Sequence, residues 1–109
     1  MAVSFGISTA FGSSARVLAL FQGEWFNHDR ALLRLVIDGV VQTGPGDSIS
    51  PFAADSGDDA GVIIDETNGF NFISNALRTG VAHTAKIQWA SVAGKQICVD
   101  ERSLIVLRP

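Results

Sequence analysis

Short apolar runs separated by glycine-rich turns follow one another along the chain. In the clearest run, residues 83–91, apolar and polar side chains alternate with a period of two. This period predicts a β-strand with one face against a core and the other face in solvent. The inward face comprises Ala85, Ile87 and Trp89, and the outward face comprises Thr84, Lys86 and Gln88.

Two earlier runs predict further strands. Residues 15–21 are largely apolar on both faces, which is typical of a central strand. Residues 31–37 end directly in Asp38-Gly39, a pair favoured in two-residue hairpin turns because both residues adopt positive φ. We therefore expect residues 40–43 to return as the hairpin partner of residues 31–37.

The C-terminal part of the chain predicts another hairpin and a final strand. A turn at 92–95 leads into a returning strand at 96–99, and residues 100–102 form a bend. The final strand, 103–107, is apolar on both faces. Such a strand must be central in a sheet or covered at an interface, because a bare apolar edge invites aggregation.

The remaining segments divide into expected loops and strands. The polar segment 24–30 is an expected loop, and so is 44–61, which is rich in glycine, serine and aspartate. A loop as long as 44–61 is the first place to look for a partner site. Strands are also expected at 3–7, 61–64 and 70–74, the last with Phe70 and Phe72 toward the core, and a turn is expected at 77–81.

These elements predict one all-β domain over residues 1–109, an antiparallel sandwich or barrel rather than alternating strands and helices. With 109 residues, the chain has the size of a domain with one hydrophobic core. Residues 1–14 are a possible N-terminal arm, which packs either on its own domain or on a neighbouring subunit.

Composition narrows the range of partners. Hydrophobic residues make up 47% of the chain and charged residues only 17%, against about 25% in a typical soluble domain, so we expect other subunits to cover some apolar surface. The net charge is −3 and the eight Lys and Arg are scattered, which argues against nucleic acid as a partner. The N-terminus lacks a basic segment followed by a long apolar one, and no run is long enough to span a bilayer. We expect no signal peptide and no membrane contact.

The inventory of reactive side chains argues against an enzyme. The chain holds two histidines, one cysteine and no tyrosine, and no nucleophile elbow, Walker loop or His-Glu-x-x-His motif. Nucleophilic catalysis would need Cys98 or a serine to converge with a histidine and a carboxylate, and Cys98, His83 and Asp100 are the candidate set. We expect Cys98 to be a buried, inert thiol instead. We expect the imidazole of His83 to tie a loop to a backbone carbonyl, and a place at a trimer axis or a metal is the alternative.

An aromatic and polar segment holds candidate ligand-binding residues. Trp25, Asn27, His28 and Asp29 have the composition of a sugar-binding platform or of a subunit contact. The alternative is that Trp25 caps the core.

The long loop holds candidate metal ligands. Asp55, Asp58 and Asp59 could supply oxygen ligands to Ca²⁺, although they match no defined calcium loop. The alternative is a solvated acidic loop that keeps the protein soluble. No other cofactor is expected.

Two segments resemble a known kind of module. Residues 77–89 form a corner of leucine, turn and glycine, followed by His-Thr and by a strand that ends in Gln-Trp, and residues 102–107 begin the final strand with Arg-Ser-Leu. They resemble the C-terminal half of small jelly-roll modules in phage tail and virion proteins and in bacterial surface proteins. Those modules are similar to the trimeric C1q-like and tumour-necrosis-factor-like sandwiches. The segments 21–25 and 35–41 fit the same layout, so the resemblance covers residues 15–107.

The resemblance implies a jelly-roll β-sandwich, often a homotrimer, that serves as a structural or adhesive part without shared catalytic residues. It favours a non-enzymatic phage virion accessory protein, such as a head-decoration or tail-fibre-tip component. We expect it in the virion or outside the cell, with other virion proteins or glycans as partners. The alternative is a lectin-like carbohydrate-binding module that uses the Trp25 segment and the 44–61 loop.

Overall fold

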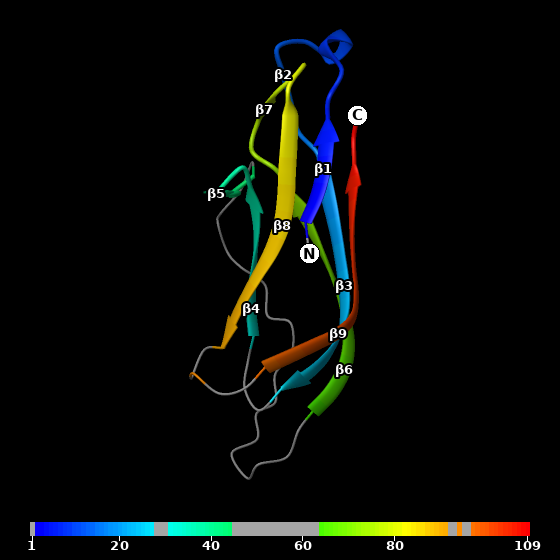
Figure 1. The fold of residues 1–109 in the computed structure, drawn as a ribbon, viewed down its shortest axis with the longest axis vertical. Coiled ribbons are helices and arrows are strands. Elements are labelled where there is room, and N and C mark those ends of the chain that lie inside the picture. Colours follow the sequence, from blue (N-terminus) through cyan, green and yellow to red (C-terminus); the bar gives the residue numbers. More distant parts are fainter. Residues whose placement is uncertain (1, 28–30, 45–63, 92–93, 95–96) are drawn as a thin grey trace.

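The computed structural model describes residues 2–27, 31–44, 64–91, 94 and 97–109. These residues form antiparallel strands and one short 3-10 helix, arranged along an elongated body (Figure 1). No helix among them is long and apolar enough to cross a membrane. The elements are β1 (Ala2–Gly6), η1 (Thr9–Phe11), β2 (Ser14–Ala15), β3 (Leu18–Asn27), β4 (Ala31–Ile37), β5 (Val40–Val41), β6 (Ile64–Ile73), β7 (Leu77–Arg78), β8 (Ala82–Ser91) and β9 (Ile97–Leu107).

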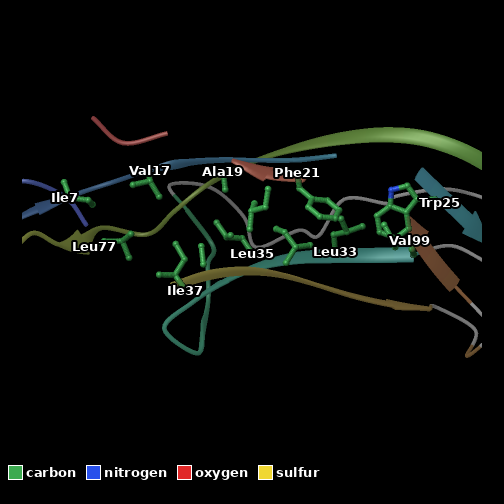
Figure 2. Packing of buried hydrophobic residues seen from close by; sticks show 14 residues of the cluster. Ile7, Val17, Ala19, Phe21, Trp25, Leu33, Leu35, Ile37, Leu77 and Val99 are labelled. Carbon is green, nitrogen blue, oxygen red and sulfur yellow. The ribbon is translucent and has the colours of Figure 1, made fainter. Parts of the chain in front are cut away.

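The strands build two main sheets and a small ladder. One sheet has the order β1-β8-β4-β5, the other has the order β6-β3-β9, and β2 pairs with β7. The two main sheets pack against each other around one hydrophobic cluster, with Phe21 and Trp25 from β3 meeting Leu33 and Leu35 from β4 (Figure 2). The expected all-β antiparallel sandwich is confirmed. The jelly-roll strand order stays a prediction.

The four-stranded sheet follows the sequence pattern closely. Along β8, Ala85 and Ile87 are buried and Lys86 is exposed, as the alternation predicts. Residues 2–6 pair with β8 in register from Ala2 opposite Lys86 onward. The N-terminal segment therefore packs on its own domain as an edge strand, which is one of the two arrangements expected for it.

The Asp38-Gly39 hairpin is confirmed. Both turn residues have positive φ, 52° for Asp38 and 80° for Gly39, and Ile37 pairs with Val40 across the turn. The returning strand β5 has two residues, shorter than the expected 40–43.

Asn75 explains why this returning strand is short. Its side-chain oxygen accepts hydrogen bonds from the backbone N–H groups of Thr43, at 2.9 Å, and Gly44, at 2.8 Å. Gly44 has φ 64°, and a Cβ there would lie 2.6 Å from the Ile73 carbonyl oxygen. Asn75 and Gly44 thus turn the chain away from the sheet.

The three-stranded sheet differs from the sequence prediction in the length of its strands. β3 is central, as expected for an apolar strand, but it extends to Asn27, so the expected loop at 24–30 is wrong over residues 24–27. The expected strand at 70–74 is confirmed over residues 70–73, but it is part of a longer strand, β6, whose polar residues before Phe70 pair with β3. Of the expected strand at 61–64, residues 61–63 lie outside the described residues. Backbone pairing on both sides of β3 outweighs the polar character of these segments.

The expected C-terminal hairpin is wrong. β9 pairs with β3 rather than with β8, so the chain crosses from one sheet to the other between them. The expected bend at 100–102 is confirmed as a bulge, because the register shifts between Gln22 and Glu24 of β3 and Glu101 has φ 45°. The final strand was expected to be central or covered, yet β9 lies at the edge of its sheet among the described strands.

Three aromatic rings contact one another in the core. Trp25 and Trp89 meet edge to face with ring centroids 5.9 Å apart, and Phe21 lies 6.2 Å from Trp25 and 6.3 Å from Trp89. Contacts of this kind join β3 of one sheet to β8 of the other. Phe70 and Phe72 pack against the same cluster from β6, as expected.

Candidate assembly surface

Trp25 is not available to bind a ligand. Its side chain is fully buried, so the sugar-platform prediction is wrong for this residue and the core alternative is correct. The alternation along β3 that buries Phe21 also turns Trp25 inward, and the indole Nε1 has no hydrogen-bond partner among the described residues. Asn27 ends β3 opposite Ile64 and Ile97, and His28 and Asp29 lie outside the described residues.

The expected calcium ligands Asp55, Asp58 and Asp59 also lie outside the described residues. Within the described part of the chain, no three His, Cys, Asp or Glu side chains gather closely enough to hold a metal ion. Cys98 was expected to be buried but is exposed. It lies on β9 next to Val99, whose side chain points into the core, so the alternation of the strand turns Cys98 outward.

His83 hydrogen-bonds a backbone carbonyl, as expected. Its Nε2 lies 2.7 Å from the Arg78 carbonyl oxygen, and its Nδ1 lies 2.6 Å from Asp38 Oδ2. The hydrogen bond to Asp38, followed by that to the Arg78 carbonyl, raises the pKa of His83 above its ordinary 6.5, and burial opposes this only in part.

Asp38 is the counterpart of His83. The hydrogen bond from His83 and the one from the Thr84 backbone N–H, at 2.8 Å, lower the pKa of Asp38 below its ordinary 3.8. Both groups of the pair therefore favour their charged forms. His83 is held by a hairpin turn and a backbone carbonyl, not by Cys98 or Asp100 as the enzyme hypothesis required.

The other two buried polar residues also bind backbone groups. Ser74 Oγ accepts from Val17 N–H at 2.9 Å and donates to the Asn75 carbonyl at 2.7 Å. Thr79 Oγ1 donates to the Gly12 carbonyl at 2.5 Å. Ser74, Thr79 and His83 thus close one end of the sandwich, and each of their polar side chains has a hydrogen-bond partner.

The most unusual surface is the outside of the three-stranded sheet. Neighbouring positions there are aliphatic: Leu18 pairs with Ile73 on one side and with Leu107 on the other, and Leu20 pairs with Ile105. Ile73, Ile105 and Leu107 are 49%, 51% and 48% exposed, and the two leucines of β3 are half-buried between them. We call this surface the outer apolar face; it comprises Leu18, Leu20, Ile73, Ile105 and Leu107.

Other kinds of side chain border the outer apolar face at its two ends. At one end, Arg16 and Arg108 donate to the carbonyls of Ser74, at 2.7 Å, and Gly6, at 3.2 Å. Also at this end, the exposed ring of Phe11 and Leu107 line a shared hollow of about 360 Å³. On the β6 side, the exposed Asn71 lies opposite Leu20, and at the other end the aliphatic positions give way to Gln22 and Ser103, which are exposed.

The sequence pattern predicted part of the outer apolar face. Both 15–21 and 103–107 were expected to be apolar on two faces, which indicated covered surface. What sequence reasoning missed is that β3, β6 and β9 are neighbours, so that their outward aliphatic residues form one surface. No local pattern reports the pairing of strands that lie so far apart in the sequence.

A second hollow, of about 560 Å³, lies over β4 and β8 of the other sheet. Its lining includes Leu32, Trp89 and Ala90 together with Arg34, whose Nε donates to Gln88 Oε1 at 2.8 Å.

Comparison with protein families, with curated proteins and with solved structures finds no match for the chain.

Proposed function

We propose that this chain is a non-enzymatic structural protein, a phage virion accessory component such as a head-decoration or tail-fibre-tip protein, that assembles as a homotrimer. The outer apolar face is the surface that the subunits bury. The observation that carries this proposal is the continuous aliphatic surface across three neighbouring strands. The resemblance of residues 77–89 and 102–107 to virion jelly-roll modules supports the trimer and the place in a virion.

Burial of this surface is favourable. Ile73, Ile105 and Leu107 are each about half exposed, so covering one of them contributes on the order of 1 kcal/mol. All five members of the outer apolar face are uncharged, so a partner desolvates no ion when it covers them. Contiguous apolar patches of this kind mark protein–protein contacts on soluble proteins.

The position of β9 adds a second reason for assembly. Among the described strands β9 pairs only with β3, so its outer backbone edge has no strand partner there. The bulge and the charged residues 100–102 interrupt one half of this edge, whereas residues 103–107 carry none of these protective features. A subunit packed on the outer apolar face would also shield this half of the edge.

The solution mass of the protein tests the assembly. We expect light scattering to give three times the chain mass of 11.5 kDa over a range of concentrations. Ile105→Lys should reduce the mass to that of one chain, because it places a charge on the covered surface. Ser4→Lys makes a comparable change at an exposed position of β1 in the other sheet and should leave the trimer intact.

Circular dichroism establishes that both variants are folded. A wild-type protein that stays monomeric at high concentration would overturn the proposal, and so would a folded Ile105→Lys variant that remains trimeric. The place in a virion has its own test, in which antibodies against the purified protein are used to label phage particles from the source organism. Particles without label would refute the virion assignment and leave the assembly result standing.

A carbohydrate-binding module is the second candidate, and the hollow over β4 and β8 favours it. Its volume lies within the range of small-molecule sites, and it combines apolar lining with the hydrogen-bonding groups of Arg34 and Gln88. This candidate predicts glycan-array binding that Arg34→Ala abolishes and Arg78→Ala retains, because Arg78 does not line the hollow. Silence on the array, with tryptophan fluorescence unchanged by added sugars, would exclude it.

A further inference from the structure

The imidazole of His83 joins three elements that the chain places far apart. The residue itself lies near the start of β8, Asp38 lies in the β4–β5 turn, and the Arg78 carbonyl lies at the end of β7. Phe5 of β1 packs on the ring with centroids 5.5 Å apart. The side chain of His83 is only 6% exposed, so bulk water has little access to the ring.

Both hydrogen-bond partners of the ring are acceptors. A carboxylate oxygen lies 2.6 Å from Nδ1 and a carbonyl oxygen lies 2.7 Å from Nε2. Neutral imidazole carries one N–H and one lone pair, whereas imidazolium carries two N–H groups. Only imidazolium can donate to both oxygens, and the neutral ring would direct a lone pair at one of them.

We propose that His83 is a proton-operated clasp, in which the imidazolium ring holds the β4–β5 hairpin to the β7–β8 corner and loss of its proton releases the hairpin. Apart from this contact, the hairpin has a ladder of only two residue pairs, Val36 with Val41 and Ile37 with Val40, and two further backbone hydrogen bonds. These bonds run from Gln42 N–H to the Leu35 carbonyl, at 2.9 Å, and from Asp38 N–H to the Thr84 carbonyl, at 3.0 Å. Val40 and Val41 are exposed and add little packing. Asp38 also holds a positive φ of 52°, which the hydrogen bonds of its carboxylate help to maintain.

The release is local. Beyond the hairpin, Thr43 and Gly44 stay bound to the Asn75 side chain, and the core side of β4 stays packed against β3. The segment set free therefore comprises residues 38–41 and their contact with Thr84.

The charges around the ring determine the direction of the switch. Among the described residues, Asp38 is the charged group that acts on His83; β1 presents the Phe5 ring, and β7 presents a main-chain carbonyl while the Arg78 side chain is exposed. Lys86 lies three residues along β8, on the opposite face of the strand. The pKa of His83 is raised, in agreement with the geometry. The clasp is therefore closed below pH 6.5 and opens as the pH rises through the raised value.

The test is nitrogen-detected NMR of the imidazole ring with amide exchange on the intact protein from pH 5 to 9. Resonances of His83 are assigned as those absent from His83→Gln. We expect both ring nitrogens to carry a proton at pH 6 and the titration midpoint to lie above 6.5, the ordinary value. The exchange protection of the Thr84 amide should fall at least tenfold through that midpoint, while that of Ile87 in the same strand is unchanged.

The Asp38→Asn variant tests whether the charge of Asp38, rather than burial of the ring, controls the protonation of His83. It keeps an oxygen for the Thr84 N–H but removes the charge, and it should lower the His83 midpoint by at least one pH unit. Asp100→Asn removes a carboxylate from β9 in the other sheet and should leave the midpoint unchanged. Three results would each overturn the clasp. They are a wild-type midpoint at or below 6.5, a single ring proton at pH 6, and a Thr84 protection factor that does not change through the titration. The wild-type titration decides the matter even where Asp38→Asn fails to fold.

Discussion

The two main sheets share one core but present different outer faces. The outer face of the four-stranded sheet mixes polar and small apolar side chains, with Ser4, Arg34, Thr84 and Lys86 exposed. The outer face of the three-stranded sheet is aliphatic over the neighbouring ends of β3, β6 and β9. This contrast is the basis of our proposal that the three-stranded sheet is covered by other subunits.

The greatest loss of stability is expected from a substitution between the sheets, compared with the same substitution on the outer apolar face. Leu33→Ala should lower the free energy of unfolding by about 2–5 kcal/mol, because Leu33 is fully buried between the sheets. Leu20→Ala removes the same atoms from the half-buried outer apolar face and should cost about 1 kcal/mol or less. Urea denaturation measures both, in an Ile105→Lys background that prevents association. Equal losses would mean that the outer apolar face belongs to the core.

A smaller loss of stability is expected from a substitution at Ser74, which lies at the end of the three-stranded sheet where the outer apolar face is found. Ser74 is fully buried between β6 and β7 and hydrogen-bonds Val17 N–H and the Asn75 carbonyl. Ser74→Ala leaves both backbone groups without this partner and should cost about 1–3 kcal/mol by urea denaturation. Ser4→Ala, at an exposed position, serves as the control and should change stability by less than about 0.5 kcal/mol. A neutral Ser74→Ala would show that water replaces the hydroxyl.

The pH dependence of stability should come mainly from the four-stranded sheet. His83 has a raised pKa, so its contribution is complete below pH 6.5 and is lost as the pH rises through the raised value. Asp38 has a lowered pKa, so its contribution is complete above pH 3.8 and is lost as the pH falls through the lowered value.

We therefore expect a stability plateau between pH 3.8 and 6.5, with a loss of about 1 kcal/mol at higher pH, modest because Asp38 is partly exposed. Thermal unfolding across this range measures it, and His83→Gln should flatten the alkaline limb. A wild-type protein whose stability is constant from pH 5 to 9 would contradict the assignment.

The last substitution should change the stability of the folded subunit least but should clearly weaken its association. Ile73→Thr changes an exposed residue of the outer apolar face and should alter subunit stability by less than about 0.5 kcal/mol. It should still weaken association severalfold, because a hydroxyl then enters a covered surface. Val41→Thr, at an exposed position of β5, should affect neither quantity. Sedimentation at several concentrations measures the association, and identical behaviour of the two variants would remove the contrast between the sheets.

The fold class and several local elements were predictable from the residue pattern alone. The alternation along residues 83–91 gave the two faces of β8, and the Asp38-Gly39 pair gave a hairpin whose turn residues have the expected positive φ. The position of His83 beside a glycine turn was enough to predict its bond to a backbone carbonyl. These predictions succeeded because they depend on period, turn stereochemistry and nearby residues, all of which are local properties of the chain.

Three features depend on contacts between distant segments: the direction of the Trp25 side chain, the pairing of β9 with β3, and the gathering of the outward aliphatic residues on one surface. Trp25 lies in a polar segment that reads as a loop, yet pairing on both sides of β3 extends the strand and turns the indole into the core. The apolar character of 103–107 was visible in the sequence, but its place beside Leu18 and Leu20 depends on a crossing between sheets. Strand pairing over such separations follows from packing of the whole core, because the free energy gained by burying side chains between the sheets exceeds the weak local preferences of the segments.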